Sequence, residues 1–403
     1  MDCGVTVVED ASPLPQPDSW VDALFGTGLT RAPGGAEGAL IGRINADHAH
    51  GSRVYAADIP SGLNGETGQA YDPCVHADAT VTFQFLKTGM TLADGLDACG
   101  GITVADVGFP TDGFDLNAAA LFEPDDLGRI LKKRPRNVHK GDCGHLLIVA
   151  GSFGMAGAAA LCAKAALRSG VGLVSVACPR SIVPILQTLA PQAMCIPLAE
   201  SEGAICAEAL PVLETALKGK SAVAVGPGLS RRADAGVLRL VLESGLPAVI
   251  DADGLNLLSE HRELMTLLTQ KHVLTPHPGE AARLLGQPCT NPFTDAAALC
   301  ELGASVLLKG AASVIRAPEC PTAWISASGC QGMARGGSGD VLTGILGALL
   351  ADRRGVESAH AAACASEIHG LAGELAQRKY GARSMNAADI LEFLPEVFRE
   401  YVE

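Results

Sequence analysis

The chain has 403 residues, of which 48% are hydrophobic and 18% charged, and its formal net charge is −14. This composition supplies enough apolar residues for a large core and excludes intrinsic disorder, and the length favours two domains. The negative charge argues against a general nucleic-acid-binding protein, because neutralisation of phosphates by cations dominates such binding.

The cysteines and the apolar segments indicate a protein of a reducing compartment. The thirteen cysteines include no CxxC pair, so they are typical neither of a disulfide framework nor of a zinc site. The first ten residues lack the features of a signal peptide, and the apolar run 341–351 is too short to span a bilayer. We therefore expect a cytoplasmic protein with no membrane partner.

Residues 1–118 are predicted to form part of an α/β unit. The expected strands are 20–25, 53–59, 79–85 and 102–107, and glycine-rich turns follow the first two. Asp58 lies at the end of the second expected strand. Such turns suit ligand loops at the carboxyl edge of a sheet, although Gly and Asp also form ordinary turns.

A basic cluster, Lys132-Lys133-Arg134-Pro135-Arg136, marks the expected boundary. We assign 119–140 as a linker and the start of the second domain, which continues over 141–403. The cluster has two interpretations, a solvated surface or a nucleic-acid patch, and the acidic composition favours the first.

From residue 141 onward, short apolar runs alternate with helical patterns. The expected strands are 145–150, 173–177, 222–225, 248–250, 273–275 and 305–308. The expected helices are 155–168, 181–190, 232–244, 280–285, 294–302, 340–352, 356–377 and 386–399. This alternation predicts a mainly parallel sheet covered by helices on both faces.

The loops after the later strands are rich in Gly and polar residues. They read GPGL (226–229), DADGLN (251–256), PHPGE (276–280) and KGAAS (309–313), and a fifth loop, GGSGD (336–340), precedes a helix. Because the carboxyl ends of parallel strands meet at one edge, we expect these loops to share one cleft.

The loop 336–340 is suited to an anion. Its glycines allow close backbone approach, and the helix N-terminus offers free amides with partial positive charge. The helix itself is expected to be striped, with Val341, Ile345 and Ala348 on one face. Asp340 has two possible roles: it caps the helix, or it handles a proton beside a phosphate.

Other polar residues in these loops are also open to two interpretations. His277 is either structural or functional, and its place among the loops favours function. Lys309 is either a surface lysine or a point charge for phosphate. Asp251, Asp253 and Asn256 either organise water around magnesium or cap the next helix.

Several common catalytic motifs are absent from the sequence. Residues 151–157, GSFGMAG, follow an expected strand but do not match GxGxxG. The chain also lacks a Walker GxxxxGK[ST], an HExxH and a GxSxG motif. These absences argue against a Rossmann dehydrogenase, a P-loop NTPase, a zincin and an α/β-hydrolase.

Residues 121–403 resemble the ribokinase-like superfamily, and within it the ADP- or ATP-dependent NAD(P)H-hydrate dehydratases. The resemblance lies in HKGDCGHLLIVAGSFGMAG (139–157), AVGPGL (224–229), DADGLNLL (251–258), TPHPGEAARLLG (275–286), LLKGAASVI (307–315) and GMARGGSGDVLTGILGALLA (332–351). It implies a three-layer αβα domain, preceded here by a partial Rossmann-like α/β domain.

The resemblance implies dehydration of NADHX or NADPHX to NADH or NADPH, with ADP or ATP and Mg²⁺. Asp340 is then the catalytic residue, and the anion hole consists of Gly336, Gly337, Ser338 and Gly339. The nucleotide contacts are Lys309, Gly310, Ala311, Ala312, Ser313 and Gly339. The substrate contacts are Ala158, Gly228, His277 and Asp340.

The N-terminal part resembles the later half of NAD(P)H-hydrate epimerase domains through VDALFGTGL (21–29) and AADIPSGLNGETG (57–69). This implies a potassium site at Asp22 and Ser61. The implied substrate contacts are Gly26, Thr27, Gly28, Leu29, Arg31 and Asp58.

The epimerase family's upstream Asn-Asn-Gly-Gly-Asp loop has no counterpart here. We therefore expect an incomplete potassium site and little or no epimerase activity. A mis-assigned start codon and a fragment both fit this beginning.

Two alternative functions remain on sequence grounds. One is a ribokinase-like kinase of a small vitamin-type alcohol, and the other is a nucleotide-binding regulatory module. The expected partners are the small-molecule substrate, further copies of the chain in a homo-oligomer, and a separate epimerase.

Overall fold

The structure is a computed structural model that describes residues 8, 14–110, 119–318 and 320–403. The chain forms two compact units, Met1–Leu116 and Asn117–Glu403. The boundary expected after residue 118 falls beside residues 111–118, which lie outside the described residues. No helix in the described ranges is both long and apolar enough to cross a membrane.

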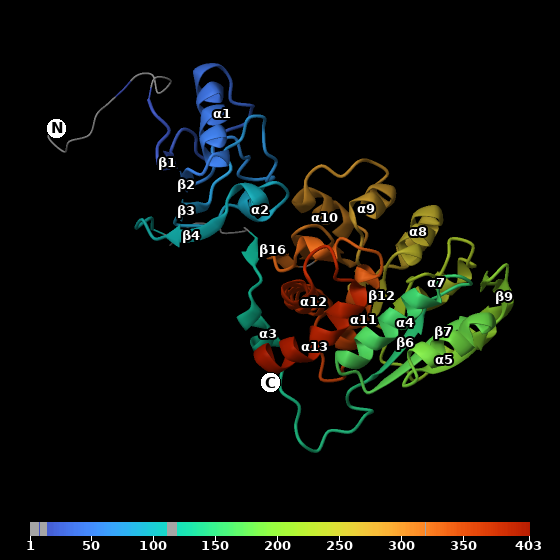
Figure 1. The fold of residues 1–403 in the computed structure, drawn as a ribbon. Coiled ribbons are helices and arrows are strands. Elements are labelled where there is room, and N and C mark those ends of the chain that lie inside the picture. The colour runs from blue at the N-terminus through green and yellow to red at the C-terminus, as the bar shows by residue number, and fades with distance from the viewer. Residues whose placement is uncertain (1–7, 9–13, 111–118, 319) are drawn as a thin grey trace. The chain divides into compact units, whose positions relative to one another are not determined.

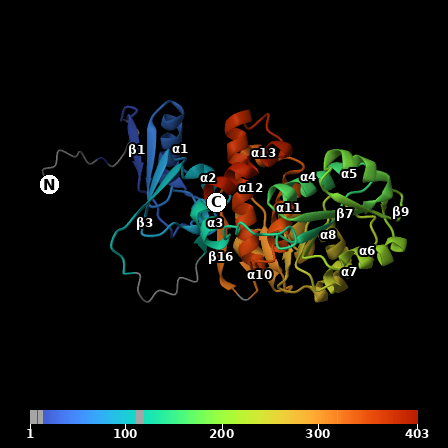
Figure 2. The same ribbon diagram turned by 90° about the horizontal axis from the view of Figure 1, so that it is seen from below.

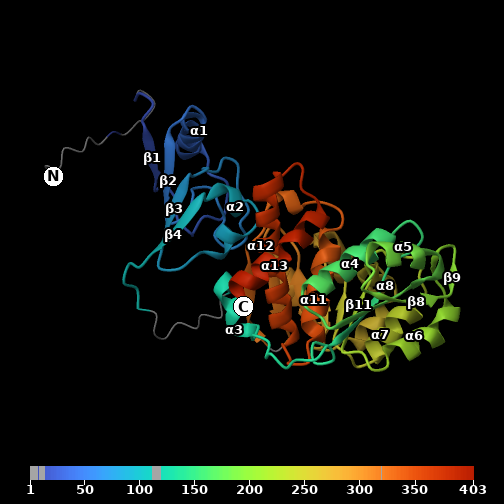
Figure 3. The same ribbon diagram turned by 60° about the horizontal axis from the view of Figure 1, so that its bottom comes forward.

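The first unit contains a four-stranded parallel sheet in the order β1-β2-β3-β4. The strands are β1 (Ser19–Asp22), β2 (Arg53–Ala57), β3 (Ala79–Phe83) and β4 (Gly101–Ala105), and the helices are α1 (Gly35–Ala49), the 3₁₀ turn Thr88–Thr91 and α2 (Gly95–Ala98). Figure 3 shows the strands in this order beside α1. All four expected strands form, but each ends earlier than expected; β2 stops before Asp58, whose φ is +71°.

Side chains alternate between the two faces of this small sheet, as strand geometry requires. One face contributes to a small core that includes Ile41, Ile44 and Val54. The other face leaves large apolar side chains more than a third exposed, among them Val21, Tyr55, Val81 and Phe83.

The second unit is built on a ten-stranded sheet in the order β5-β16-β15-β14-β13-β12-β11-β6-β7-β8. The strands are β5 (Ala120–Leu121), β6 (His145–Val149), β7 (Leu173–Pro179), β8 (Met194–Leu198), β11 (Ala222–Val225), β12 (Ala248–Ile250), β13 (His272–Leu274), β14 (Ser305–Leu308), β15 (Ser313–Ala317) and β16 (Cys320–Ser326). The run from β8 to β14 is parallel, as expected. β15 is antiparallel to both β14 and β16, which the sequence reading did not predict.

Helices cover both faces of this sheet, giving the expected αβα layers (Figures 1 and 2). One layer contains α4 (Ala156–Arg168), α5 (Val183–Leu189), α11 (Ser338–Ala351), α12 (Ser358–Tyr380) and α13 (Ala387–Tyr401), with α3 (Pro124–Ile130) packed on α12 and α13. The other contains α6 (Leu210–Leu217), α7 (Gly236–Glu243), α8 (Asp253–Glu260), α9 (Pro278–Leu285) and α10 (Pro292–Cys300). A short hairpin, β9 (Glu200–Ser201) and β10 (Ala204–Ile205), follows β8.

Helix α11 is the central helix of its layer and packs on both α4 and α12. Every residue of α11 except Gly339 and Asp340 is buried. The expected helix forms, and it is apolar on all sides because it is surrounded by protein. Gly344 allows the close packing with α4, since a Cβ there would lie 2.3 Å from the Cys162 carbonyl oxygen.

Candidate active site at the N-terminus of helix α11

Four of the glycine-rich loops meet at the carboxyl edge of the parallel strands. A Cβ on Gly226 would lie 1.8 Å from the Asp251 carbonyl oxygen, so only glycine allows the loop after β11 to touch the loop after β12. A Cβ on Gly339 would lie 3.6 Å from Lys309 Nζ and 3.8 Å from Asp251 Oδ2. The loop before α11 therefore lies beside the ends of β12 and β14, as the spacing of the loops predicts.

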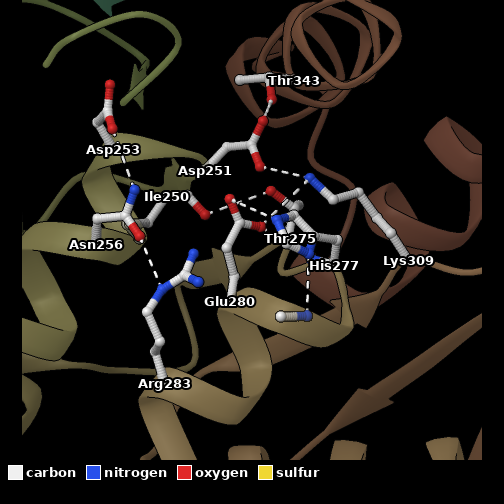
Figure 4. Close-up of polar contacts among 11 residues, drawn as sticks. Ile250, Asp251, Asp253, Asn256, Thr275, His277, Glu280, Arg283, Lys309 and Thr343 are labelled. Atoms are coloured by element: carbon white, nitrogen blue, oxygen red, sulfur yellow. Dashed lines mark hydrogen bonds and ion pairs between the residues drawn. The ribbon is translucent and has the colours of Figure 1, made fainter. Parts of the chain in front are cut away.

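A buried ion pair stands at the centre of this edge. Lys309 Nζ lies 2.7 Å from Asp251 Oδ1, and the hydroxyl of Thr343 donates to Asp251 Oδ2 over 2.6 Å (Figure 4). Burial alone would raise the pKa of Asp251, but Lys309 and these hydrogen bonds outweigh burial and hold the pKa below its usual value. Asp251 is thus an anion held in place.

Lys309 also faces a second buried carboxylate. Its Nζ lies 4.0 Å from Glu280 Oε2 in α9. Burial lowers the pKa of Lys309, yet Asp251 and Glu280 more than compensate and raise it above the usual value. Lys309 is therefore a fixed cation, paired with carboxylates rather than projecting freely from the strand end.

Asp340 occupies the first turn of α11, where a carboxylate normally ionises easily. Here burial and the nearby charges of Asp251 and Asp253 raise its pKa to about 7, and Lys309 only partly offsets them. A carboxyl group with this pKa exchanges protons near neutral pH, as a general base or acid must.

The backbone around Asp340 is arranged to receive an anion. Gly337 caps α11 with φ of +95°, a conformation that favours glycine. The first helical hydrogen bond runs from the Val341 amide to the Gly337 carbonyl over 3.2 Å. The amides of Gly339 and Asp340 precede it, and so they point out of the helix end toward a ligand position.

The anion loop is held from behind by helix α12. Ser338 Oγ lies 3.2 Å from His369 Nε2, and both residues are buried. Burial lowers the pKa of His369 to about 4, so this imidazole is neutral at physiological pH. Farther along α12, Glu374 Oε1 accepts from the Gly329 amide and Gln377 Oε1 accepts from the Gly332 amide, at 2.9 and 3.1 Å.

His277 lies at the N-terminus of α9 and caps that helix. Its Nδ1 accepts a hydrogen bond from the Gly279 amide at 3.0 Å, and its backbone amide donates to Glu280 Oε2 at 2.9 Å. With Nδ1 accepting, Nε2 carries the proton and faces Glu280 Oε1 at 3.5 Å. The ring is 53% exposed, so it remains accessible to a ligand.

Ala158 and Gly228 lie together beside the loop 151–157. A Cβ on Gly228 would lie 3.0 Å from the Ala158 Cβ. The hydroxyl of Ser152 donates to the Gly228 carbonyl over 2.9 Å, which joins the loop after β6 to the loop after β11. Ala158 lies in α4, the helix that packs against α11.

The segment 309–313 is the turn between β14 and β15. Gly310, Ala311 and Ala312 form the turn, and Ser313 begins β15. The Lys309 amide donates to the Pro276 carbonyl at 2.8 Å, so this turn is tied to the loop that carries His277.

Asp253 and Asn256 support the local backbone. Asp253 Oδ2 accepts from the Ser230 amide at 2.8 Å, and its Oδ1 accepts from Asn256 at 3.1 Å. Neither caps α8, whose N-cap is Ala252 with φ of +47°. Among the residues that the structure describes, no group of three or more His, Cys, Asp and Glu is placed to hold a metal ion by itself.

In the first unit, Asp22 and Ser61 are brought together. Asp22 is buried and accepts from the Ser61 amide at 2.7 Å and from its hydroxyl at 2.6 Å. Asp58 pairs instead with Lys87, which sequence reasoning did not select. The loop of Gly26, Thr27, Gly28, Leu29 and Arg31 lies at the surface after β1.

Sequence reasoning missed Glu280, Thr343 and His369. Glu280 had a signal, because an acidic residue at the third helical position forms a capping box with the residue before the helix. Thr343 had a weaker sequence signal, because it follows Asp340 by one helical turn. His369 had none, since its partner Ser338 is 31 residues away.

Comparisons with known protein families cover both units of the chain. A family model described as NAD(P)H-hydrate dehydratase matches residues 146–396, and one described as YjeF-related protein N-terminus matches residues 1–89. The bifunctional NAD(P)H-hydrate repair enzyme of Moorella thermoacetica is 40% identical over 96% of this chain and 74% of its own length. The corresponding Escherichia coli enzyme is 36% identical over 94% of this chain and 71% of its own length.

Solved structures agree on the fold. A ribokinase-like superfamily protein from Enterococcus faecalis V583 matches with a TM-score of 0.62 at 24% identity, over 73% of this chain and 99% of its own. An ADP/ATP-dependent NAD(P)H-hydrate dehydratase from Bacillus subtilis, co-crystallised with ATP/Mg²⁺, matches with a TM-score of 0.58 at 26% identity, over 70% of this chain and 99% of its own. The chain belongs to the bifunctional NAD(P)H-hydrate repair enzymes, and its second unit is a ribokinase-like NAD(P)H-hydrate dehydratase domain.

Proposed function

We propose that the second unit dehydrates NAD(P)H-hydrate with consumption of ATP or ADP, and that Asp340 is its catalytic base. The observation that carries this proposal is the position of Asp340: a carboxyl with a pKa of about 7, in the first turn of a glycine-capped helix, near the half-buried Lys309. The Bacillus subtilis relative, named as ADP/ATP-dependent and co-crystallised with ATP/Mg²⁺, supports the use of a nucleotide.

The chemistry follows from the leaving group. Hydroxide leaves a carbon poorly, whereas phosphate leaves well. Asp340 accepts the proton of the ring hydroxyl, whose oxygen then bonds to the terminal phosphorus of the nucleotide as the bridging P–O bond breaks. The ring nitrogen then supplies the electron pair that expels phosphate, and loss of a neighbouring proton restores NAD(P)H.

The loop before α11 stabilises the phosphoryl group during transfer. The free amides at Gly339 and Asp340 donate to its oxygens, and the helix end adds partial positive charge. Gly336, Gly337 and Ser338 complete this anion hole. The hydroxyl of Ser338 is held by His369, which acts as a positioning residue because it is buried behind the loop.

The remaining assignments follow from neighbouring loops. The turn 309–313, tied to the His277 loop, lies beside Gly339 and is proposed to contact the nucleotide. Ala158, Gly228 and His277 are proposed to line the hydrate site. Lys309 holds Asp251 and places its positive charge near the phosphates.

Magnesium fits this edge as a partner of the nucleotide. Mg²⁺ is usually held by substrate phosphates with one or two carboxylates, and it keeps several waters. Asp340 would be one such carboxylate, because the oxygens of Asp251 already contact Lys309 and Thr343 and those of Asp253 accept from Ser230 and Asn256. The ion supplies charge neutralisation for the phosphates when bound.

The test is incubation of the chain with NADHX, MgCl₂ and ATP or ADP while NADH absorbance is recorded. We expect NADH formation that requires nucleotide and is lost in Asp340→Asn. A phosphorylated product without NADH would instead identify a kinase of a small alcohol. Nucleotide binding without turnover would identify a regulatory module.

Four further expectations stay predictions: potassium at Asp22 and Ser61, weak epimerase activity, a homo-oligomer and a cytoplasmic location.

A further inference from the structure

A second cavity lies within the C-terminal unit, at the far end of helix α11 from Asp340. It has a volume of about 660 Å³, inside the range of roughly 300–1,000 Å³ that is typical of small-molecule sites. Leu349 and Asp352 contribute to it from the end of α11. Since α11 has 14 residues, the two sites are separated by roughly 20 Å along the helix.

The lining of this cavity is strongly basic, although the whole chain carries a net charge of −14. Two side-chain carboxylates, Asp352 and Glu403, line it. The cations that line it are Lys132, Lys133, Arg134, Arg168, Arg354 and Arg399. The basic cluster singled out in the sequence is exposed, as the first interpretation expects, and its residues Lys132, Lys133 and Arg134 also line this cavity.

Two of these cations form ion pairs and hydrogen bonds within the protein. Arg134 donates to the Gly170 carbonyl and lies 3.8 Å from Asp352 Oδ2, and Arg354 donates to Asp352 Oδ1 at 2.9 Å. Arg354 also donates to the Lys132 carbonyl at 2.9 Å. Arg134 and Arg354 thus compensate the charge of Asp352 and the partial negative charge of backbone carbonyls at helix ends.

The side chains of the other four cations make no such contacts within the described ranges. Within the ranges that the structure describes, none of the side chains of Lys132, Lys133, Arg168 and Arg399 forms an ion pair or a hydrogen bond. Uncompensated cations around a concavity repel one another, so they favour a bound anion.

Ser169 lies at the wall of the cavity, but its Oγ is shielded from solvent and has no hydrogen-bond partner among the described residues. Because water does not reach this oxygen, a ligand in the cavity does not reach it either. The four unpaired cations are therefore the groups that would bind an anion such as phosphate.

The remaining wall is apolar. Ile130, Leu349, Val356, Phe398 and Val402 line the cavity beside the cations. Figure 1 shows α3 beside the C-terminal end of α13, the two elements that supply Ile130 and Phe398. A ligand that fills this space therefore combines an anionic group with an apolar or aromatic part.

We propose that this cavity binds a small organic phosphate, with the phosphate at Arg168 and Arg399 and the apolar part against Phe398. The site is distinct from the dehydratase site and does not depend on the function proposed for it.

The experiment is calorimetric titration of the full chain with phenyl phosphate, with inorganic phosphate as the probe that lacks the ring. The test variant is Arg168→Glu with Arg399→Glu, and the matched control is Lys218→Glu with Arg262→Glu, which changes the charge equally at exposed positions. We expect phenyl phosphate to bind more tightly than inorganic phosphate. We expect the test variant to lose at least about tenfold in affinity and the control to lose much less, because distant charges are screened.

Two further variants separate a loss of binding from a loss of folding. If the reversed variant fails to fold, Arg168→Gln with Arg399→Gln replaces it, with circular dichroism to verify folding. Ser169→Ala should leave phenyl phosphate binding unchanged while raising the melting temperature of the ligand-free chain, because it removes an unsatisfied buried hydroxyl that the ligand does not reach. No binding to the unmodified chain, or equal affinity in the test and control variants, would overturn the proposal.

Discussion

At the scale of single residues, the active site places a carboxyl group under opposing influences. The helix N-terminus and Lys309 favour the anion of Asp340, whereas burial, Asp251 and Asp253 favour the protonated form. The second set of influences is stronger and brings the pKa to about 7. Perturbed carboxyl groups of this kind concentrate at functional sites.

Asp340→Asn should abolish turnover and preserve the fold. General base catalysis contributes roughly 10²- to 10⁴-fold, so kcat should fall by that order while ATP binding persists. The folded-state pKa of Asp340 is raised from 3.8 to about 7, so its stabilising contribution is fully present below pH 3.8 and is lost as pH rises from there to about 7. The melting temperature of the variant should therefore exceed that of the unmodified chain by more at pH 8 than at pH 5. Normal turnover by the variant would contradict the assignment.

The pH profile of kcat/KM provides a separate check. Because the base must be deprotonated, activity should rise with pH through about 7 and then level off. The charge of Asp253 raises the pKa of Asp340, so Asp253→Asn should move the inflection to lower pH. A profile without an inflection between pH 6 and 8 would exclude Asp340 as the titrating group.

The Asp251–Lys309 pair should matter for stability as well as for activity. Lys309→Met leaves Asp251, which is only 2% exposed, without its cation. Breaking a buried pair in this way costs about 3–5 kcal/mol of unfolding free energy, measurable by urea denaturation. Arg239→Met is the control, because its pair with Glu243 is exposed and should contribute about 0–1 kcal/mol. Similar losses in both variants would show that burial of the pair is irrelevant.

At the scale of elements, α11 and its two neighbours form the rigid frame of the site. Helix α4 packs directly on α11 at Gly344, and α12 holds the incoming loop through His369, Glu374 and Gln377. Rigid elements position catalytic groups more accurately than loops do. The polar side chains of α12 thus explain how an exposed glycine-rich loop keeps one conformation.

Two glycine substitutions in α4 and α11 should have opposite effects on stability. Gly344→Ala puts a Cβ 2.3 Å from the Cys162 carbonyl oxygen, and such overpacking costs about 1–3 kcal/mol. Gly157→Ala, in the first turn of α4, meets open space and should gain up to about 1 kcal/mol from helix propensity. Urea unfolding measures both. A stabilised Gly344→Ala would show that the two helices do not pack this closely.

At the scale of the whole molecule, the two units have separate cores. Among the described residues, one large apolar cluster of the second unit includes buried side chains of α4, α11, α12 and α13, while two small clusters lie in the first unit, around Ile44 and around Met90. A small core buries less apolar surface and therefore stabilises a domain less than a large core does. Every residue proposed for the dehydratase site lies in the second unit.

A chain of residues 119–403 should therefore retain nucleotide-dependent dehydration. The expected kcat is comparable to that of the full chain, measured by NADH absorbance, because no proposed dehydratase residue lies before position 119. The Asp340→Asn form of the shorter chain is the inactive control. Loss of folding or activity on shortening, verified by circular dichroism, would show that the first unit is required.

The sequence by itself determined the layered fold and the loops of the site. Fully apolar runs such as 222–225 and 248–250 became buried parallel strands with those same bounds, because a strand covered on both faces must be apolar throughout. The loops then met at one edge because parallel strands share a direction. Asp340 and His277 were selected on this ground.

Only the tertiary structure decided which partners those residues have. The pairing of Asp251 with Lys309 joins positions 58 apart, and that of Ser338 with His369 joins positions 31 apart. No local pattern encodes such contacts, since they depend on how α11 and α12 pack. The antiparallel β15 and β16, the full burial of α11 and the basic cavity around Ser169 were hidden for the same reason: burial and charge balance are properties of the assembled layers, and not of any single segment.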